Sequence, residues 1–197
     1  INGGGGSCIT NTSNLNTAPI ISAGTDYTIP KGTAFVLTGT GTDPNGDPLT
    51  YLWEQYDNTN NTQPPVSTAT VGPVYRSLTP TASPSRYFPA LSSVLANNLV
   101  PKWEVTPSVA RTLNFRFTVR DNRAGGSANN SDDMKITVNA TAGPFVVTAP
   151  NTAVSYAGGS TQTITWNVAG TTANGVNCAN VDILISTNGG STWSTLL

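Results

Sequence analysis

Residues 111–139 read RTLNFRFTVRDNRAGGSANNSDDMKITVN and contain the clearest secondary-structure signal in the chain. Four apolar residues alternate with polar ones in the first part: Leu113, Phe115, Phe117 and Val119. A period of two is typical of a strand with one buried face. Residues 133–139 repeat the pattern after a Gly-Gly loop at residues 121–126. The stretch therefore predicts a hairpin of two long strands that closes a β-sandwich, with Arg116 and Arg120 facing solvent.

The chain before this hairpin has the same period of two. Strands are expected at residues 34–38, 49–56, 74–78 and 86–88, and one or two helical turns at residues 91–97. Trp53 is expected in the core. Residues 57–110 are rich in Pro, Ser, Thr and Asn, and so long an irregular connection is either functional or partly structured.

A second unit is expected after residues 141–144. Its strands are predicted at residues 145–148, 162–167, 181–186 and 192–195, with a hairpin turn at residues 187–191 and Trp166 in the core. About four strands are fewer than the seven or so of an immunoglobulin-like sandwich, and the open edge could pair with another chain. The fold prediction is all-β, with two tandem immunoglobulin-like sandwiches: a linker (residues 1–18), a first sandwich (19–140, with an insertion at 57–110) and an incomplete second one (141–197).

The amino-acid composition limits the functional classes to which this chain can belong. Charged residues are 10% of the 197 and the formal net charge is -1, which is the profile of a secreted or cell-surface β protein. No clustered basic surface is evident for nucleic acid, and no apolar run approaches the roughly 20 residues that cross a bilayer. Cys8 and Cys178 are the only cysteines. They either pair with each other or stand as an unpaired Cys8 and a buried Cys178 thiol.

The sequence contains no histidine. Ser-His-Asp and Cys-His arrangements, the HExxH motif and His-ligated metals are therefore excluded. Glu54, Asp57 and Glu104 are the acids to consider for glycoside hydrolysis, but Glu54 reads more simply as a surface residue or the partner of an arginine. We therefore expect that this chain has no catalytic site of its own.

An acidic turn is the strongest candidate site. Residues 42–53 read TDPNGDPLTYLW, with Asp43, Asn45 and Asp47 around a glycine. Calcium takes six to eight hard oxygen ligands, and such a turn can direct several oxygens at one point. Asp121, at the end of the long strand, is the natural additional ligand if its loop lies at the same end. The alternative is a tight turn whose Asx side chains bond to backbone amides without a metal.

Aromatic residues give a second candidate. Trp103 and Trp193 are less clearly committed to a core than Trp53, and exposed aromatics beside Asn and Thr can stack on sugars. A carbohydrate-binding module or adhesin would use the segment from Tyr75 to Trp103, with Tyr75, Tyr87 and Trp103 as ligand-binding candidates.

The chain from Asn16 onward resembles the region downstream of the catalytic domain in secreted reprolysin-like zinc metalloproteases of Bacteroidetes-type bacteria. The resemblance rests on RYFPAL (residues 86–91), VRDNRAGG (119–126), GGSTQTITWNVAGT (158–171) and VNCANVDILISTNGGSTW (176–193). DPNGDPLTY is shared more widely, with cadherin-like and polycystic-kidney-disease (PKD) domains. The resemblance implies a PKD- or cadherin-like first sandwich, a fibronectin-type second one, an upstream protease domain as partner, and export by a type IX system.

The resemblance also implies a ligand set. In similar PKD-type domains, calcium is bound by an asparagine before the first strand, by acids of the D-x-[DN]-G turn and by the aspartate that ends the penultimate strand. The matching positions are Asn16, Asp43, Asn45 and Asp121, with Asp47 as a further candidate. The implied function is a non-catalytic accessory region that acts as a calcium-stabilised spacer or docks a protein or polysaccharide substrate or a surface. The alternatives are the adhesin or carbohydrate-binding module and a structural subunit of a surface assembly.

Overall fold

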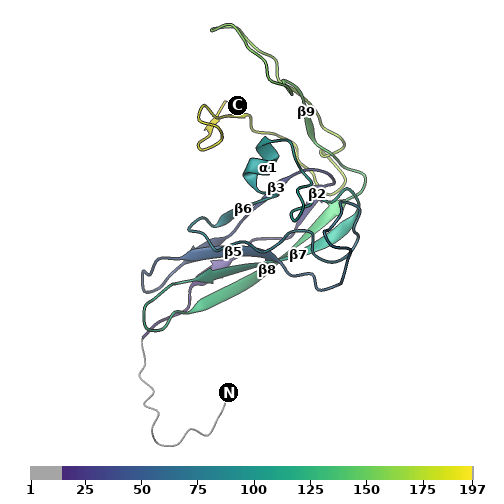
Figure 1. Cartoon of the computed structure of the whole chain (residues 1–197). Helices are drawn as coiled ribbons and strands as arrows, with labels where there is room; N and C mark the ends of the chain where they lie inside the picture. Colours follow the sequence, from purple (N-terminus) through teal and green to yellow (C-terminus); the bar gives the residue numbers. More distant parts are fainter. Residues whose placement is uncertain (1–14, 197) are drawn as a thin grey trace, which may run out of the picture.

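The structure is a computed structural model and describes residues 15–196, which are nearly all β (Figure 1). The elements in chain order are β1 (Ile20–Ser22), β2 (Tyr27–Pro30), β3 (Phe35–Thr38), β4 (Thr40–Thr42), β5 (Thr50–Gln55), β6 (Ser85–Phe88), α1 (Leu91–Leu95), β7 (Arg111–Arg120), β8 (Asn129–Asn139), β9 (Val146–Ala149), β10 (Thr165–Asn167), β11 (Leu184–Ile185) and β12 (Ser194–Thr195). No helix in this part of the chain is long and apolar enough to cross a membrane.

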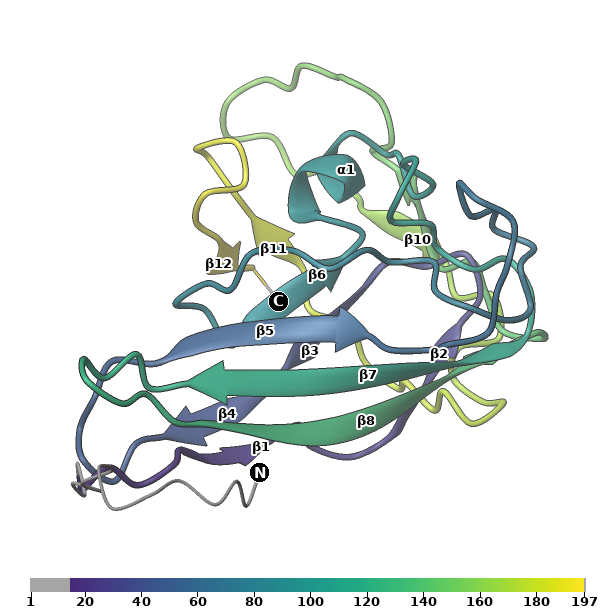
Figure 2. The ribbon, with the colours of Figure 1, turned by 60° about the horizontal axis from the view of Figure 1, so that its bottom comes forward.

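A four-stranded sheet forms the larger layer, in the order β2-β8-β7-β5. Strands β7 and β8 pair antiparallel over the full length of β7, which confirms the predicted hairpin. Strand β5 adds antiparallel to β7, and β2 adds parallel to β8 (Figure 2). Strand β8 begins at Asn129, earlier than predicted, because its polar residues Asn129–Asp132 continue the register with β7. Arg116 and Arg120 are exposed, as predicted.

Two shorter antiparallel pairs, β3–β6 and β1–β4, form the opposing layer. The sheets enclose one core in a sandwich-like arrangement. Its fully buried side chains include Trp53, Phe88, Leu113, Phe115, Phe117, Val119, Ile136 and Val138. Gly39 separates β3 from β4, and a Cβ there would lie 2.4 Å from the Phe117 ring. The layers therefore meet closely at this glycine.

The irregular segment at residues 57–110 contributes to this core. The predicted strand at residues 86–88 lies within β6, and the predicted helical turns are α1. The strand predicted at residues 74–78 is wrong. The backbone N–H groups of Val74 and Tyr75 donate to the Gln55 side-chain oxygen, at 2.8 and 3.1 Å, and only an isolated bridge joins Tyr75 to Glu104. A buried side chain thus takes the place of a neighbouring strand.

The second region, residues 141–196, holds two separate two-stranded sheets, β9–β10 and β11–β12. Its four strands were predicted, although β10, β11 and β12 are shorter than expected. The turn at residues 187–191 joins β11 and β12 as predicted. Trp166 is half-buried and not in a closed core. Cys178 is exposed, so the predicted buried thiol is wrong, and Cys8 lies outside the described residues.

The two regions meet around the end of β8. Lys31 N–H donates to Ala142 O (3.0 Å), and Phe145 N–H donates to the Thr33 hydroxyl oxygen (3.0 Å). The Asn139 side chain donates to Asn174 O (2.7 Å). The second region therefore attaches through backbone groups at the end of the first sandwich, on the side of α1 (Figure 1).

Candidate functional site

The acidic turn after β4 forms the first part of the candidate site. One oxygen of Asp43, Oδ1, accepts hydrogen bonds from the N–H groups of Asn45 (2.8 Å) and Asp47 (3.0 Å). Gly46 supports the turn with a φ of 80°. This is the Asx geometry that the sequence offers without a metal. The other oxygen, Asp43 Oδ2, is buried and has no hydrogen-bond partner among residues 15–196.

Asp121, directly after β7, forms the second part. The residue is fully buried, and its carboxylate accepts hydrogen bonds from Arg123 N–H (3.2 Å) and Ala128 N–H (2.9 Å). Desolvation by burial acts to raise the pKa of Asp121. The hydrogen bonds from Asn16, Ser127 and these two backbone amides outweigh it and lower the pKa to about 2. Asp121 is therefore charged at neutral pH.

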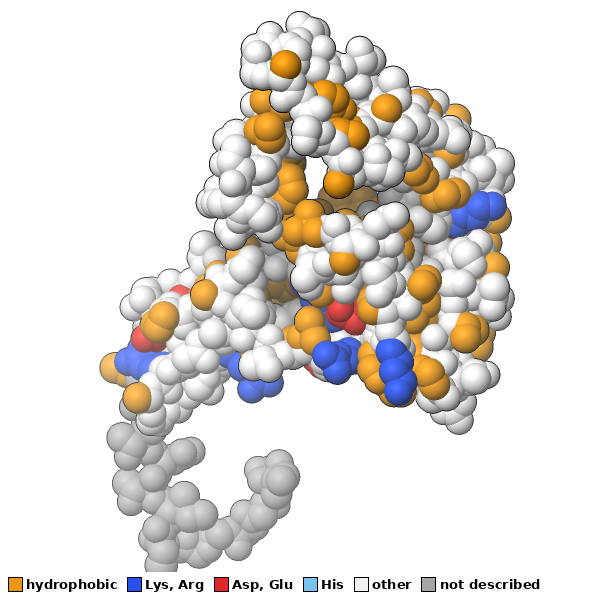
Figure 3. All heavy atoms as spheres, turned by 45° about the horizontal axis from the view of Figure 1, so that its top comes forward, with side chains coloured by type: hydrophobic (Ala, Val, Ile, Leu, Met, Phe, Trp, Pro, Cys, Tyr) orange, Lys and Arg blue, Asp and Glu red, His pale blue; other side chains and the backbone are white. Residues whose placement is uncertain are grey.

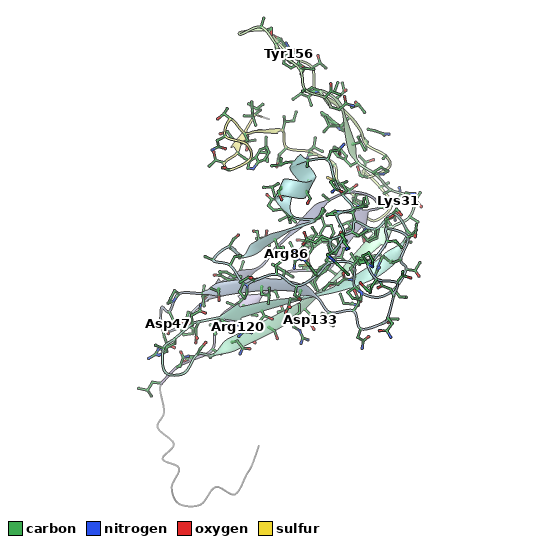
Figure 4. The ribbon with its side chains drawn as sticks, in the orientation of Figure 1. Lys31, Asp47, Arg86, Arg120, Asp133 and Tyr156 are labelled. Atoms are coloured by element: carbon green, nitrogen blue, oxygen red, sulfur yellow. The ribbon has the colours of Figure 1, made fainter. Side chains whose placement is uncertain are left out.

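The tertiary structure brings the two parts together. Asp43, Asp47 and Asp121 each offer one carboxylate oxygen, and these oxygens all lie within 4.8 Å of one another. Figure 4 shows Asp47 at the end of the sandwich opposite Lys31, with Arg120 on the same side of the molecule as Asp47. The condition set by the sequence, that the turn and the Asp121 loop share one end, is met.

Arg123 is the one cation in contact with this cluster in the described part of the chain, through Nη1 to Asp47 Oδ2 at 3.2 Å. Sequence reasoning missed it, although its position two residues after Asp121 is a local signal. Three carboxylates and one guanidinium leave a formal charge of -2. Like charges at this separation destabilise one another unless a cation joins them.

The N-terminal linker docks at the same place. Asn16 Nδ2 donates to Asp121 Oδ2 (2.5 Å) and to Gly126 O (2.9 Å). Asn45 Oδ1 accepts from Thr17 N–H (2.9 Å), and its Nδ2 donates to Leu15 O (3.4 Å). Asn16 thus reaches the carboxylates through its amide nitrogen, and Asn45 holds the linker. As calcium ligands, both would have to turn an oxygen toward the ion.

The residues suit a hard divalent cation. The cluster offers only oxygen donors, a buried Asp43 oxygen with no described partner, and an uncompensated charge of -2. Calcium prefers carboxylate and carbonyl oxygens, whereas zinc sites in proteins use mainly Cys and His. If calcium binds, Asp43, Asp47 and Asp121 would hold it.

The aromatic candidates do not form one surface. Tyr75 is 2% exposed and packs edge-on against Phe35 and Phe88, so it is a core residue and not an open platform. Burial also raises the pKa of Tyr75. Tyr87 is 40% exposed and Trp103 38% exposed. Trp103 lines two hollows, and Tyr87 lines neither.

Two of the three acids considered for hydrolysis, Asp57 and Glu104, are held in structural hydrogen bonds. Glu104 is buried and pairs with Arg86 at 2.7 Å, and its other oxygen accepts from Ala90 N–H. Asp57 accepts from Gln55 and from Asn114. Desolvation by burial lowers the pKa of Arg86, although Glu104 opposes this shift. Both carboxylates are thus engaged in hydrogen bonds within the first sandwich.

Comparison with protein-family models, with curated proteins and with solved structures finds no match for this chain.

Proposed function

We propose that this chain is a non-catalytic accessory region of a secreted zinc metalloprotease, in which the first sandwich is a calcium-stabilised spacer that also docks a substrate or a surface. The observation that carries the calcium role is the cluster of Asp43, Asp47 and Asp121 beside the linker residue Asn16. The protease assignment rests on the sequence resemblance, which also suggests a PKD- or cadherin-like first sandwich and a fibronectin-type second one.

Calcium would act at the junction between the linker and the first sandwich. Three segments distant in sequence meet there: the linker, the turn after β4 and the loop after β7. A divalent ion would replace the repulsion among three carboxylates by attraction to one centre. Because the unfolded chain does not hold these carboxylates together, binding would favour the folded state by mass action. The result would be a stiffer connection to the preceding domain.

Thermal unfolding in calcium and in EDTA tests the calcium role. At a calcium concentration 100 times the dissociation constant, the folded state gains about 2.7 kcal/mol, so the melting temperature should rise by several degrees. The variant Asp43→Asn should lose most of this rise. Asp43 is the informative position because one of its oxygens has no partner in the described part of the chain.

Asp182→Asn is the matched control, because Asp182 is exposed and lies in the second region. It should keep the full calcium effect. A wild-type melting curve that is identical in excess calcium and in EDTA would refute the calcium role and leave the stretch as an Asx turn.

A further inference from the structure

Two hollows lie on the first region, residues 15–140 of the chain. Both are lined by Arg76 and Trp103. One has a volume of about 240 Å³, and its other lining residues include Gln63, Pro65 and Pro73. The other has a volume of about 320 Å³ and is lined by Lys102 together with residues of the α1 segment: Ala90, Ser92 and Ser93. Trp103 is 38% exposed between them. The two hollows thus adjoin each other at the exposed Trp103 side chain, and together they are called the groove below.

The groove carries unbalanced positive charge. Arg76 and Lys102 are exposed, and neither forms an ion pair with any residue of the described range 15–196. Glu104 is the acid in the wall, and its carboxylate is already bound to Arg86 and to Ala90 N–H. The Lys102 ammonium lies over the Trp103 ring, 5.8 Å from its centroid, in a cation–π contact. Figure 3 shows Lys and Arg side chains beside hydrophobic surface on the first region.

The groove wall is built before any ligand arrives. Arg76 N–H donates to Trp103 O (3.0 Å), and Val105 N–H donates to Val74 O (2.9 Å). Glu104 N–H donates to Pro101 O (3.1 Å), and the Glu104 carboxylate is fixed by Arg86. These bonds hold the backbone that presents Trp103, so ordering it costs little on binding.

We propose that this groove binds an acidic polysaccharide, one whose sugar rings carry carboxylate or sulfate groups. Trp103 would stack against the apolar face of a sugar ring, while Arg76 and Lys102 bind the anionic group of the same or the next ring. The Gln63 amide and the hydroxyls of Ser92 and Ser93 supply hydrogen bonds to sugar hydroxyls. The combination of an aromatic ring and two cations that form no ion pair with the described residues distinguishes this ligand from a neutral glycan.

This inference deepens the docking part of the proposed function and rests on it, but it does not rest on calcium. The acidic cluster lies at the linker end of the sandwich, whereas the groove adjoins α1. Binding is therefore measured in EDTA. If no acidic saccharide binds but calcium still raises the melting temperature, docking at this groove is refuted. The spacer role is then retained.

The test is isothermal titration of the whole chain with four probes: an alginate oligosaccharide for carboxylate, a chondroitin sulfate oligosaccharide for sulfate, a cello-oligosaccharide as the neutral glycan, and poly-glutamate as the acidic peptide. At least one acidic saccharide should bind at least tenfold more tightly than the neutral glycan and poly-glutamate. Its affinity should fall as NaCl is raised, because the contacts are exposed.

The variants separate the aromatic and ionic contributions. Trp103→Ala should weaken binding about tenfold or more, on the scale of one stacked aromatic. Arg76→Gln combined with Lys102→Gln should weaken it at least as much and remove most of the salt dependence. Arg120→Gln and Trp193→Ala are the matched controls, because Arg120 is exposed outside the groove and Trp193 lines neither hollow.

Three results would overturn the proposal: no binding of either acidic saccharide, equal binding of poly-glutamate, or an equal loss of affinity in the controls. The arginine–lysine double variant changes only exposed side chains. It therefore decides the question even if Trp103→Ala folds poorly.

Discussion

Two regions of this molecule have similar strand-forming sequences and very different burial. In β7, Leu113, Phe115, Phe117 and Val119 are all fully buried. In β9 every residue is exposed, and Leu184 in β11 is 49% exposed. The difference lies in what faces each sheet. Strands β3, β6, β1 and β4 cover the first sheet, whereas β9–β10 and β11–β12 remain separate pairs. Apolar alternation specifies a strand, but burial requires a second layer.

The largest expected effect comes from truncating a core aromatic ring in the first region. Phe117 is fully buried, with its ring centroid 4.7 Å from that of Trp53 and 5.8 Å from that of Tyr51. Phe117→Ala should lower the free energy of unfolding by about 3–5 kcal/mol in urea. Leu184→Ala is the counterpart in the second region and should cost less than about 1 kcal/mol. Equal losses would show that the second region has a closed core in solution.

Two glycines, Gly39 in the first region and Gly158 in the second, allow the packing of the two regions to be compared. A Cβ at Gly39 meets the Phe117 ring at 2.4 Å, whereas a Cβ at Gly158 meets nothing within 4 Å. Gly39→Ala should therefore destabilise the chain by about 1–3 kcal/mol through overpacking. Gly158→Ala should be neutral or slightly stabilising. Urea unfolding of both variants, with circular dichroism as the probe, measures the difference; a neutral Gly39→Ala would contradict the close approach of the layers.

The pH dependence of stability should depend on Asp121. Its pKa of about 2 in the folded state lies below the ordinary value of 3.8, so the folded state favours the ionised form. This contribution is complete above the ordinary pKa and is lost as the pH falls through about 4 to 2. In EDTA, the melting temperature of Asp121→Asn should fall less across that window than that of the wild-type chain. Asp182→Asn should keep the wild-type slope, and parallel curves for all three proteins would contradict the prediction.

The smallest expected effect concerns the contact between the regions. Asn139 Nδ2 donates to Asn174 O, and Asn139 Oδ1 accepts from the N–H groups of Thr141 (2.6 Å) and Ala142 (2.9 Å). Asn139→Ala should cost about 1 kcal/mol, the usual net value of such bonds. Hydrogen exchange should become faster at residues 170–178, with no change in β7. Faster exchange throughout β7 would mean that the two regions unfold together.

Much of the first region could be predicted because its signals are local. The residues of β7 follow the alternation of the sequence, and the loop to β8 contains Gly125 and Gly126, both at positive φ. The Asx turn at Asp43 likewise depends on neighbours within four residues. By contrast, Tyr75 reads as an exposed aromatic in a polar segment. Only the Gln55 side chain and the Phe35 and Phe88 rings explain its burial.

The candidate metal site also combines features that the sequence predicted with features that it did not predict. The sequence predicted that Asp43, Asp47 and Asp121 could share an ion, since a turn and a strand end can meet at one edge of a sandwich. It did not indicate Arg123, or that Asn16 would reach Asp121 through its nitrogen. Both facts depend on side-chain directions at contacts that span up to 105 residues. No local rule determines such directions.

By itself, the sequence determined that this is a β protein without histidine chemistry, with a long hairpin and an acidic turn, and with Asp182 as its one charged side chain after Lys135. These follow from composition and from backbone preferences that act within a few residues. Only the tertiary structure decided that residues 57–110 supply core side chains and that three carboxylates gather beside the linker. It also decided that Arg76 and Lys102 flank an exposed Trp103 and form no ion pair within residues 15–196. Those outcomes depend on which distant segments pack together, and packing is a property of the whole chain.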